Sequence, residues 1–540
     1  MKNFFQRNTL SAAVFITGAS VLIIEIVATR ILAPYYGNTI FTVSSVITVI
    51  LAALSVGYYA GGTLADRHPS YRWFFGIILL SGLGILLFHF VGAIALPLLS
   101  LRFSLATGPL VSSAFLFFLP ALLLGMLSPY AIKLQIVYHA EAGLRRAEAG
   151  FGPAEAGIGN IAGKIFFWST FGSILGSLLA GFVLIPNFGI NQIVVANGIV
   201  LFALGFLSLL ALGTAKKYLH RLLFSFVIIA VAAGLVRTEP VEGDIVYRRE
   251  GIYQRITIYD GEYAGRPARF FQQDRNSSGA MFLDSEDPRD LAYEYSKYYA
   301  LYKIFTPNVR DAVIIGGGAS SMLKAILVEL PDASFDVVEI EPSLFELARK
   351  YFRVPDSPRI RTYAEDGRRF LRDTEKSYDM IFSDVASSLF SIPAHFATQE
   401  FFELAKSKLN EGGLFIVNMI GDLAREQPSL ILSEIRTFQS IFPNSYFFGV
   451  ESPEEIKPQN IILVGHKSNT KIDVAALLSR GHPDPALRSF GDKLIDTGRL
   501  ELSRYPVLTD NFSPTEYFAA KALTHFAGFE RAFRFAPKKE

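Results

Sequence analysis

The chain has 540 residues, of which 51% are hydrophobic, and its formal net charge is only +2. A mean hydropathy of +0.33 excludes a purely water-soluble protein of this length. Because there are no cysteines, disulfides, thiolate catalysis and cysteine-ligated metals are excluded. The eight histidines show no ligand spacing, so we expect no metal cofactor.

The charge is divided between two halves. Residues 1–237 contain 14 Lys/Arg and 5 Asp/Glu, a net of +9, whereas the remainder contains 37 and 44, a net of −7. A basic, apolar half followed by an acidic half predicts a membrane domain and then a soluble domain. The acidic half argues against a nucleic-acid partner and suits a small cationic substrate, although an ordinary solvated surface explains it equally well.

We expect three domains: transmembrane helices over 1–237, a small β-sheet over 238–285 and a Rossmann-like domain over 286–540. Seven segments of the first domain are long and apolar enough to cross a bilayer, which takes about 20 residues. They lie at 10–33, 40–62, 73–99, 109–132, 165–185, 190–213 and 219–236. The lipid bilayer is therefore an expected partner, and the segment from His139 to Lys164 is expected to be a loop with a short surface helix.

Basic residues fall in alternate loops, and this pattern places the N-terminus in the cytoplasm. Seven crossings would then put the soluble domain outside, yet the donor suggested below is a cytosolic metabolite. We expect a multi-pass protein of the cell (inner) membrane with a cytoplasmic soluble domain. Glu25 and Arg30 in the first helix are either a functional pair or a structural ion pair, since charge is costly in lipid.

The pattern changes after Arg237. The stretch Y-Q-R-I-T-I-Y-D-G, from Tyr253 to Gly261, alternates apolar and polar residues and predicts a small antiparallel sheet. A helix is expected near 288–305, where clustered aromatic residues are more typical of a core than of ligand contacts. They are Tyr293, Tyr295, Tyr298, Tyr299 and Tyr302.

Strands and helices then alternate. Strands are expected at 312–315, 335–340, 359–363, 380–383, after the E-G-G turn in L-F-I-V-N-M, and at 461–464. Helices are expected at 320–329, 342–351, from 366 onward and at 398–409. The order predicts an α/β Rossmann-like domain of the S-adenosylmethionine-methyltransferase type, preceded by the small sheet.

The strand ends carry the candidate binding residues. Gly316, Gly317 and Gly318 follow the first strand, at the point where the next helix begins. Glycine at these positions lets a ligand approach the backbone closely. Glu339, about 20 residues later, suits two ribose hydroxyls. Asp366 suits an adenine amino group, and this order favours a sulfonium-nucleoside site over a dinucleotide site. Acids at the ends of parallel strands are placed where such sheets bind ligands.

Residues from about 250 to 465 resemble the spermidine synthase (polyamine aminopropyltransferase) family. The helices and the late motif L-T-D-N-F-S-P-T-E, from Leu508 to Glu516, resemble its membrane-fused branch. The matching motifs are Y-Q-R-I-T-I, V-I-I-G-G-G, V-V-E-I-E-P, A-R-K-Y-F, E-D-G-R-R-F-L, Y-D-M-I-F-S-D and T-Q-E-F-F-E-L-A-K-S-K-L-N-E-G-G-L-F.

The resemblance implies a membrane-bound aminopropyltransferase that uses decarboxylated S-adenosylmethionine and an amine such as putrescine, and releases methylthioadenosine. It implies that Gln254 and Gly367 contact the donor, that Asp384 accepts the proton of the amine, and that Tyr253 and Ser387 lie at the amine. A helix N-cap is the alternative for Asp384. Soluble relatives oligomerise, so a homo-oligomer is expected.

Two departures keep other functions open. The glycine turn reads G-G-G-A-S instead of G-G-G-D-G, with Ala319 in place of an acid, and D-V-A-S-S replaces D-x-x-D-P, with Ser387 in place of the second acid. Glu294 or Asp510 could compensate. One alternative is a methyltransferase that uses S-adenosylmethionine, or another sulfonium-donor transferase. The other is a membrane transporter or scaffold whose soluble domain senses a nucleoside without catalysis.

Overall fold

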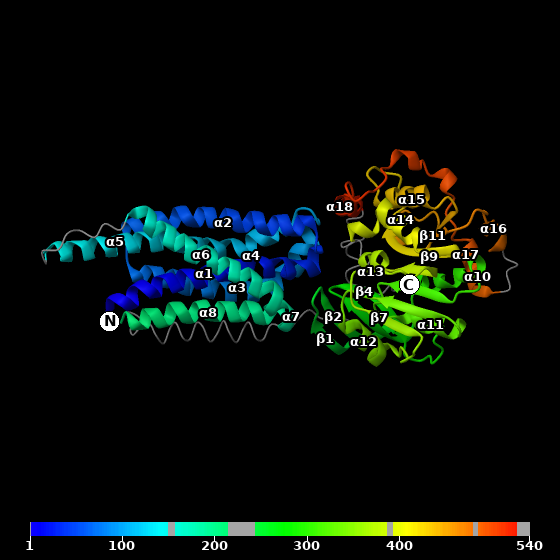
Figure 1. The fold of residues 1–540 in the computed structure, drawn as a ribbon, viewed down its shortest axis with the longest axis horizontal. Helices are drawn as coiled ribbons and strands as arrows, with labels where there is room; N and C mark the ends of the chain where they lie inside the picture. The colour runs from blue at the N-terminus through cyan, green and yellow to red at the C-terminus, as the bar shows by residue number, and fades with distance from the viewer. Residues whose placement is uncertain (1, 149–156, 214–242, 386–392, 479–483, 526–540) are drawn as a thin grey trace. The chain divides into compact units, whose positions relative to one another are not determined.

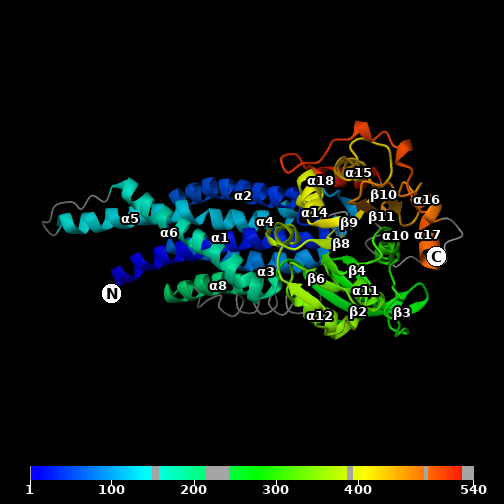
Figure 2. The same ribbon diagram turned by 45° about the vertical axis from the view of Figure 1, so that its right-hand side comes forward.

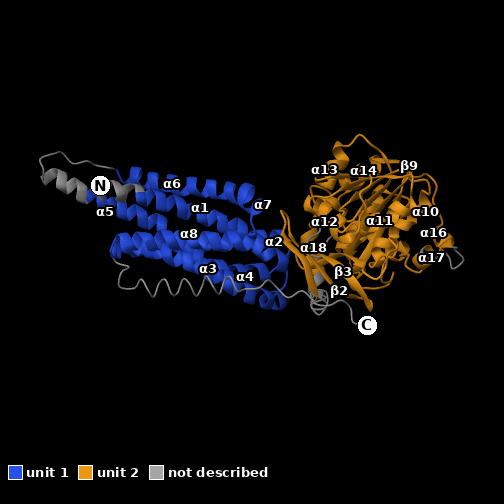
Figure 3. Ribbon diagram, turned by 90° about the horizontal axis from the view of Figure 1, so that it is seen from below, with its two compact units in different colours: residues 1–240 blue, residues 241–540 orange. Residues whose placement is uncertain are grey.

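The computed structural model describes residues 2–148, 157–213, 243–385, 393–478 and 484–525. The chain divides into two compact units, unit 1 (Met1–Pro240) and unit 2 (Val241–Glu540), which are coloured separately in Figure 3. The described part of unit 1 is all helical, and both sheets lie in unit 2. Each unit is described by itself below.

Unit 1 is a bundle of long apolar helices (Figure 1). They are α1 (Lys2–Tyr36), α2 (Ile40–Arg67), α3 (Tyr71–Arg102), α4 (Gly108–Gly125), α5 (Leu127–Glu148), α6 (Ile158–Leu179), the π-helix η1 (Ala180–Leu184), α7 (Ile185–Asn187) and α8 (Ile190–Ala211). Six stretches of the described residues are long and apolar enough to cross a membrane: Thr9–Tyr36, Ile40–Arg67, Tyr71–Arg102, Gly108–Ala140, Ile158–Asn187 and Ile190–Ala211. They coincide with the first six predicted segments, and the seventh, at 219–236, lies outside the described residues.

The helices of unit 1 approach one another closely through small residues. A Cβ atom on Gly18 of α1 would lie 2.2 Å from the carbonyl oxygen of Ser169 in α6, so only glycine allows this contact. The loop predicted between His139 and Lys164 is shorter than expected, because α5 extends to Glu148 and α6 already begins at Ile158. The Ala and Glu residues of this stretch are strong helix formers, which explains the longer helix.

Unit 2 begins with the predicted small antiparallel sheet. Its strands follow one another in the order β1 (Asp244–Glu250), β2 (Arg255–Tyr263), β3 (Arg266–Gln273) and β4 (Asn276–Phe282). Apolar residues of this sheet, including Ile256, Ile258 and Phe271, form one cluster with Ala319 and Leu347. The sheet therefore packs against the segment that holds the glycine turn.

The stretch at 288–305 is helical but not one regular α-helix. It forms the 3₁₀-helix η3 (Glu294–Leu301) and the short helix α10 (Tyr302–Phe305). Tyr298, Tyr299 and Tyr302 are buried in the core, as predicted for clustered aromatics. Tyr295 lies at the edge of this core, and its hydroxyl reaches the candidate site described below.

The main sheet has seven strands in the order β10-β11-β9-β8-β5-β6-β7. The strands are β5 (Asp311–Ile315), β6 (Ser334–Val338), β7 (Ile360–Tyr363), β8 (Tyr378–Ser383), β9 (Leu409–Gly421), β10 (Ser445–Gly449) and β11 (Gln459–His466). Strands β7, β6, β5, β8 and β9 are parallel, and β11 and β10 join antiparallel to β9 and to each other. The predicted E-G-G turn lies inside β9, where Gly412 adopts a φ of +77°.

Helices cover both faces of this sheet, as Figures 1 and 2 show. The helices that follow the strands are α11 (Ser321–Glu329), α12 (Ser343–Phe352), α13 (Gly367–Asp373), α14 (Gln399–Ser407) and α15 (Leu430–Ile441). Residues of α11 share one core with η3, and residues of α13, α14 and α15 share the other. The last elements of the described residues are short: α16 (Val474–Leu477), α17 (Pro485–Gly491), η5 (Thr497–Arg499), η6 (Leu502–Arg504) and α18 (Thr515–His525). This architecture confirms the predicted Rossmann-like domain of the methyltransferase type.

Strand β5 lies between β6 and β8, although β8 comes later in the chain. The chain passes from β5 to β6 and β7 on one side and then returns to β8 on the other side, so the strand order reverses direction at β5. Such a switch point opens a crevice at the carboxyl ends of the strands, which is the usual ligand site of open α/β sheets. The fold thus places the ends of β5 and β8 where a ligand is expected.

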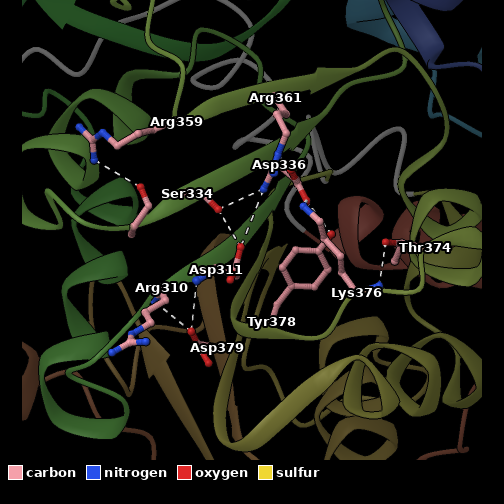
Figure 4. A network of polar contacts seen from close by, with 11 residues as sticks. Arg310, Asp311, Ser334, Asp336, Arg359, Arg361, Thr374, Lys376, Tyr378 and Asp379 are labelled. Atoms are coloured by element: carbon pink, nitrogen blue, oxygen red, sulfur yellow. Dashed lines mark hydrogen bonds and ion pairs between the residues drawn. The ribbon is translucent and has the colours of Figure 1, made fainter.

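A buried carboxylate joins three strands of the sheet (Figure 4). The side chain of Asp336 in β6 is fully buried and accepts hydrogen bonds from Arg361 Nε at 2.7 Å, Lys376 Nζ at 2.9 Å and the Tyr378 hydroxyl at 2.8 Å. Burial alone would raise the pKa of Asp336, but hydrogen bonds from Lys376, Tyr378 and Arg361 lower it. Strands β6, β7 and β8 are therefore held together by one ionised group.

Candidate functional site

The glycine turn and Asp384 meet at the switch point. The amide of Gly316 donates to the carbonyl of Val338 at 2.9 Å, and the amide of Asp384 donates to the carbonyl of Ile315 at 2.8 Å. Gly316 has a φ of +82°, and a Cβ atom there would lie 2.3 Å from the backbone oxygen of Asp384. The turn requires glycine at this position for both reasons.

Glu339 follows β6 and lies against the glycine turn. Its carboxylate accepts hydrogen bonds from the amides of Gly318 at 3.1 Å, Ile340 at 2.9 Å and Glu341 at 3.3 Å. The side chain is only 7% exposed, and burial raises its pKa against the opposing effect of these hydrogen bonds. A buried carboxylate is thus fixed beside the backbone that the sequence assigns to a nucleoside.

A second acid, Glu341, anchors the loop before β2 next to Glu339. Its carboxylate accepts from the amides of Ile252 at 2.8 Å and Tyr253 at 3.4 Å. Tyr253 is 48% exposed, and Gln254 next to it is half-buried, with its carbonyl accepting from the amide of Gly251. Both residues therefore lie in a loop that Glu341 anchors.

Asp366 forms the N-cap of α13. Its carboxylate accepts from the amide of Arg369 at 2.9 Å and lies 3.0 Å from Nε2 of His395. Burial alone would raise the pKa of Asp366, but the hydrogen bonds from His395 and Arg369 lower it. A Cβ atom on Gly367 would lie 2.1 Å from Cγ2 of Ile315, so the first turn of α13 packs directly on the end of β5.

The pKa of Asp384 differs clearly from the ordinary value of an aspartate. Its Oδ1 accepts a hydrogen bond from Nδ2 of Asn418 at 2.8 Å. Burial raises the pKa of Asp384 to about 6, whereas hydrogen bonds from Asn418 and Tyr295 oppose the shift and the charge of Glu339 adds to it. The Tyr295 hydroxyl has a single hydrogen, and the carbonyl oxygen of Ser278, at 3.1 Å, is a second acceptor within its reach. A carboxyl group with a pKa near neutrality is typical of a catalytic acid or base.

The turn position that carries an acid in the resembling family has a structural role here. Ala319 is only 5% exposed and belongs to the apolar cluster with Phe271. A Cβ atom on Gly279 of β4 would lie 2.8 Å from the Cβ of Ala319, so β4 and the glycine turn are in close contact. The next residue, Ser320, adopts a left-handed φ of +52° and donates its amide to the carbonyl of Gly317.

The acids proposed to compensate for Ala319 and Ser387 are both engaged elsewhere. Asp510 forms two hydrogen bonds with Arg368, at 2.7 and 2.6 Å, and Glu294 pairs with Lys297 at 2.5 Å. Ser387 lies outside the described residues. We therefore regard Asp510 as an anchor and not as a replacement for either acid.

Asp510 anchors a segment that we call the C-terminal strap (residues 508–513). The Thr398 hydroxyl donates to Asp510 Oδ1 at 2.8 Å, and the amide of Gln399 donates to the carbonyl of Leu508 at 2.8 Å. Arg368, the partner of Asp510, also donates to the carbonyl of His395 at 3.1 Å. The strap is thus fastened to α13 and α14 next to Asp366.

The structure brings Gly316 to Gly318, Glu339 and Asp384 into one connected cluster, with Asp366 and Gly367 adjoining the end of β5. Sequence reasoning missed Asn418, His395 and the second contact of Tyr295. One signal was available for Asn418, because it is the single polar residue in the otherwise apolar strand L-F-I-V-N-M. Within the described ranges, no group of three His, Asp or Glu side chains is arranged to hold a metal ion.

Comparison with known proteins matches residues 299–474 to the spermine/spermidine synthase domain. The chain is 23% identical over 292 residues to a polyamine aminopropyltransferase of Vibrio vulnificus, covering 51% of this chain and 91% of the relative. It is 25% identical over 430 residues to a polyamine aminopropyltransferase of Corynebacterium efficiens, covering 76% of this chain and 77% of the relative. The second match is longer than unit 2, so it extends into the helices of unit 1.

Among solved structures, a probable spermidine synthase from Corynebacterium glutamicum is 24% identical and aligns with a TM-score of 0.37. That alignment covers 47% of this chain and 94% of the other. The resemblance of unit 2 to the spermidine synthase family, inferred from its motifs, is confirmed by the domain match and by the named relatives.

Proposed function

We propose that this chain, which carries a spermine/spermidine synthase domain over residues 299–474, is a membrane-anchored aminopropyltransferase. It would transfer an aminopropyl group from decarboxylated S-adenosylmethionine to a small amine such as putrescine and release methylthioadenosine. The observation that carries the proposal is Asp384, a half-buried carboxyl group with a raised pKa at the switch point, in one cluster with the glycine turn and Glu339.

In this reaction Asp384 is the proton acceptor. A protonated amine has no free electron pair, so a carboxylate must take its proton before or as it attacks. The amine nitrogen then bonds to the carbon beside the sulfonium, the carbon–sulfur bond breaks, and its electron pair returns to sulfur. Because the pKa of Asp384 is about 6, the group is mostly ionised at neutral pH yet basic enough to hold the proton.

The nucleoside end of the site rests on Glu339 and the glycine turn. Glu339 is held by three backbone amides and faces the turn, which supports its assignment to the ribose hydroxyls. Asp366 is held by Arg369 and His395, which supports a fixed carboxylate for the adenine amino group. Tyr253 and Gln254 remain proposed contacts of the amine and the donor, carried by the loop that Glu341 anchors.

We infer that the helices of unit 1 lie in the inner membrane and that unit 2 is cytoplasmic, where the donor is made. Six candidate spans lie among the described residues, and an even number of crossings returns the chain to its starting side. The proposal therefore requires that the predicted segment at 219–236, outside the described residues, does not add a seventh crossing. A homo-oligomer remains part of the proposal, by analogy with soluble relatives.

A second candidate is a transferase that uses ordinary S-adenosylmethionine. The packing of Ala319 into an apolar cluster favours it, because no acid is available at that position to hold the donor's aminopropyl group. Calorimetry with both donors separates the two functions. Tighter binding of the carboxylated donor would support the alternative and contradict aminopropyl transfer.

The proposed reaction is tested with the full chain purified in detergent. We expect methylthioadenosine to appear only when decarboxylated S-adenosylmethionine and putrescine are both present, as measured by chromatography. Binding of either donor without any turnover would contradict the proposal and support the scaffold that senses a nucleoside.

Replacing Glu339 with glutamine is expected to weaken binding of decarboxylated S-adenosylmethionine by roughly 10- to 100-fold. Hydrogen bonds to a charged group contribute about 1.5–3 kcal/mol, and the amide cannot accept from both ribose hydroxyls. Calorimetry measures the change. The matched control is Glu346→Gln, an exposed acid of α12, which is expected to bind the donor like the natural chain. Unchanged affinity of Glu339→Gln would contradict the ribose assignment.

A further inference from the structure

An asparagine lies inside a buried stretch of strand β9 in the main sheet. Asn418 of β9 is only 2% exposed, and its neighbours Val417 and Met419 are fully buried. A buried amide is costly unless both its donor and its acceptor have partners. Here Nδ2 donates to Asp384 Oδ1 at 2.8 Å, and Oδ1 accepts from Nδ2 of Asn460 at 2.9 Å.

The second asparagine belongs to the neighbouring strand β11. Asn418 pairs with Ile462 and Asn460 pairs with Ile420 in the antiparallel register, so the two asparagines are diagonal neighbours on one face of the sheet. The hydrogen bonds therefore run from β11 through β9 to the end of β8, across three adjacent strands.

The two ends of an amide are chemically opposite, and only the nitrogen can donate to a carboxylate. If the amide of Asn418 turned over, its oxygen would face the oxygen of Asp384, and its nitrogen would face the nitrogen of Asn460. Donation from Asn460 to the oxygen of Asn418 thus favours the orientation in which Asn418 donates to Asp384. A hydrogen bond to the ionised carboxylate favours that form over the protonated acid.

We propose that Asn460 is a positioning residue for the transfer reaction, because its hydrogen bond to Asn418 orients the amide that keeps Asp384 ionised. The inference rests on the proposed function of Asp384 as proton acceptor. Asn460 acts through Asn418, and its effect is on the protonation of Asp384 rather than on substrate contacts.

The test is the pH dependence of kcat/KM in Asn460→Leu. Loss of the orienting hydrogen bond is expected to move the acid limb of the profile to higher pH by about 0.5–1 unit. The matched control is Gln459→Leu, which removes the adjacent amide of β11, whose side chain instead binds the backbone of Glu451 and Ser452. The control is expected to leave the position of the acid limb unchanged, whatever its overall activity.

A double-variant cycle isolates the path through Asn418. In Asn418→Leu the limb is already shifted, and adding Asn460→Leu is expected to shift it no further. An equal shift with and without Asn418, or a uniform loss of activity at every pH, would overturn the proposal. If the leucine variant does not fold, Asn460→Ser, with a side chain too short to reach Asn418, gives the same comparison.

A readout without turnover separates this inference from the proposed function. Infrared difference titration of the full chain against Asp384→Asn reports the protonation of the Asp384 carboxyl directly. If the pKa of Asp384 shifts in Asn460→Leu but the natural chain transfers no aminopropyl group, the effect of Asn460 on Asp384 stands and the proposed reaction is rejected. An unshifted carboxyl band in a chain that does transfer aminopropyl groups would reject the positioning role alone.

Discussion

Substitution of Asp384 by asparagine is expected to lower kcat of aminopropyl transfer by about 10²- to 10⁴-fold. The amide keeps the size of the side chain but cannot take a proton from the attacking amine. Binding of the nucleoside end is expected to change little, because Glu339 and the glycine turn stay in place. Single-turnover release of methylthioadenosine measures the loss, and calorimetry checks that the donor still binds.

The activity of the natural chain is expected to depend on pH in a defined direction. Burial raises the pKa of Asp384 to about 6, and only the ionised form accepts a proton, so the activity of the natural chain is expected to fall as the pH drops through about 6. Asp379→Asn is the matched control, since Asp379 lies on the same strand and binds the amides of Arg310 and Asp311 instead. It is expected to keep the acid limb. Full activity of Asp384→Asn would show that another group accepts the proton.

Substitution of Asp336 by alanine is expected to lower the free energy of unfolding of unit 2 by about 2–4 kcal/mol. The change removes the shared acceptor of Arg361 and Lys376 and leaves the buried Tyr378 hydroxyl without this partner (Figure 4). Pulse proteolysis of the full chain in urea measures the change. The matched control is Asp311→Ala, a half-exposed acid that is 3.8 Å from Arg361 and is expected to change stability by less than about 1 kcal/mol.

The effect of Asp336 depends on pH in a defined direction. Its folded pKa is lowered, so its contribution is fully present above the pKa of the unfolded chain, roughly 3.9. The contribution is lost as the pH falls through the folded value. The difference between the natural chain and Asp336→Ala is therefore expected to shrink in acid. A difference that stays constant would mean that the ionised carboxylate is not the stabilising group.

Much of the fold could be predicted because its signals are local. A membrane span needs a continuous apolar run, and each buried parallel strand is a short apolar run that ends in glycine or an acid, as in β5 before Gly316 and β8 before Asp384. Glu339 and Asp366 could be named as candidates because Glu339 follows β6 directly and Asp366 comes three residues after β7. The irregular helix at Glu294–Leu301 could not be predicted from aromatic spacing, which 3₁₀- and α-helices share approximately.

The remaining parts of the site depend on pairs that are distant in the chain. Asn418 is 34 residues from Asp384, and Asn460 is 42 residues from Asn418. Such contacts depend on the order of the strands in the sheet, which the sequence of each strand by itself does not predict. Tyr295 was assigned to the core because its neighbours are core residues, and only the tertiary structure brings its hydroxyl to Asp384.

The C-terminal strap limits where the chain can be truncated. The family match ends at residue 474, yet Asp510 reaches back 142 residues to Arg368, on the helix that Asp366 caps. A recombination event or truncation at the edge of the shared domain would therefore separate α13 from its partner. A fragment that ends at residue 474 would lack the strap, so the folded part of unit 2 extends beyond the matched domain.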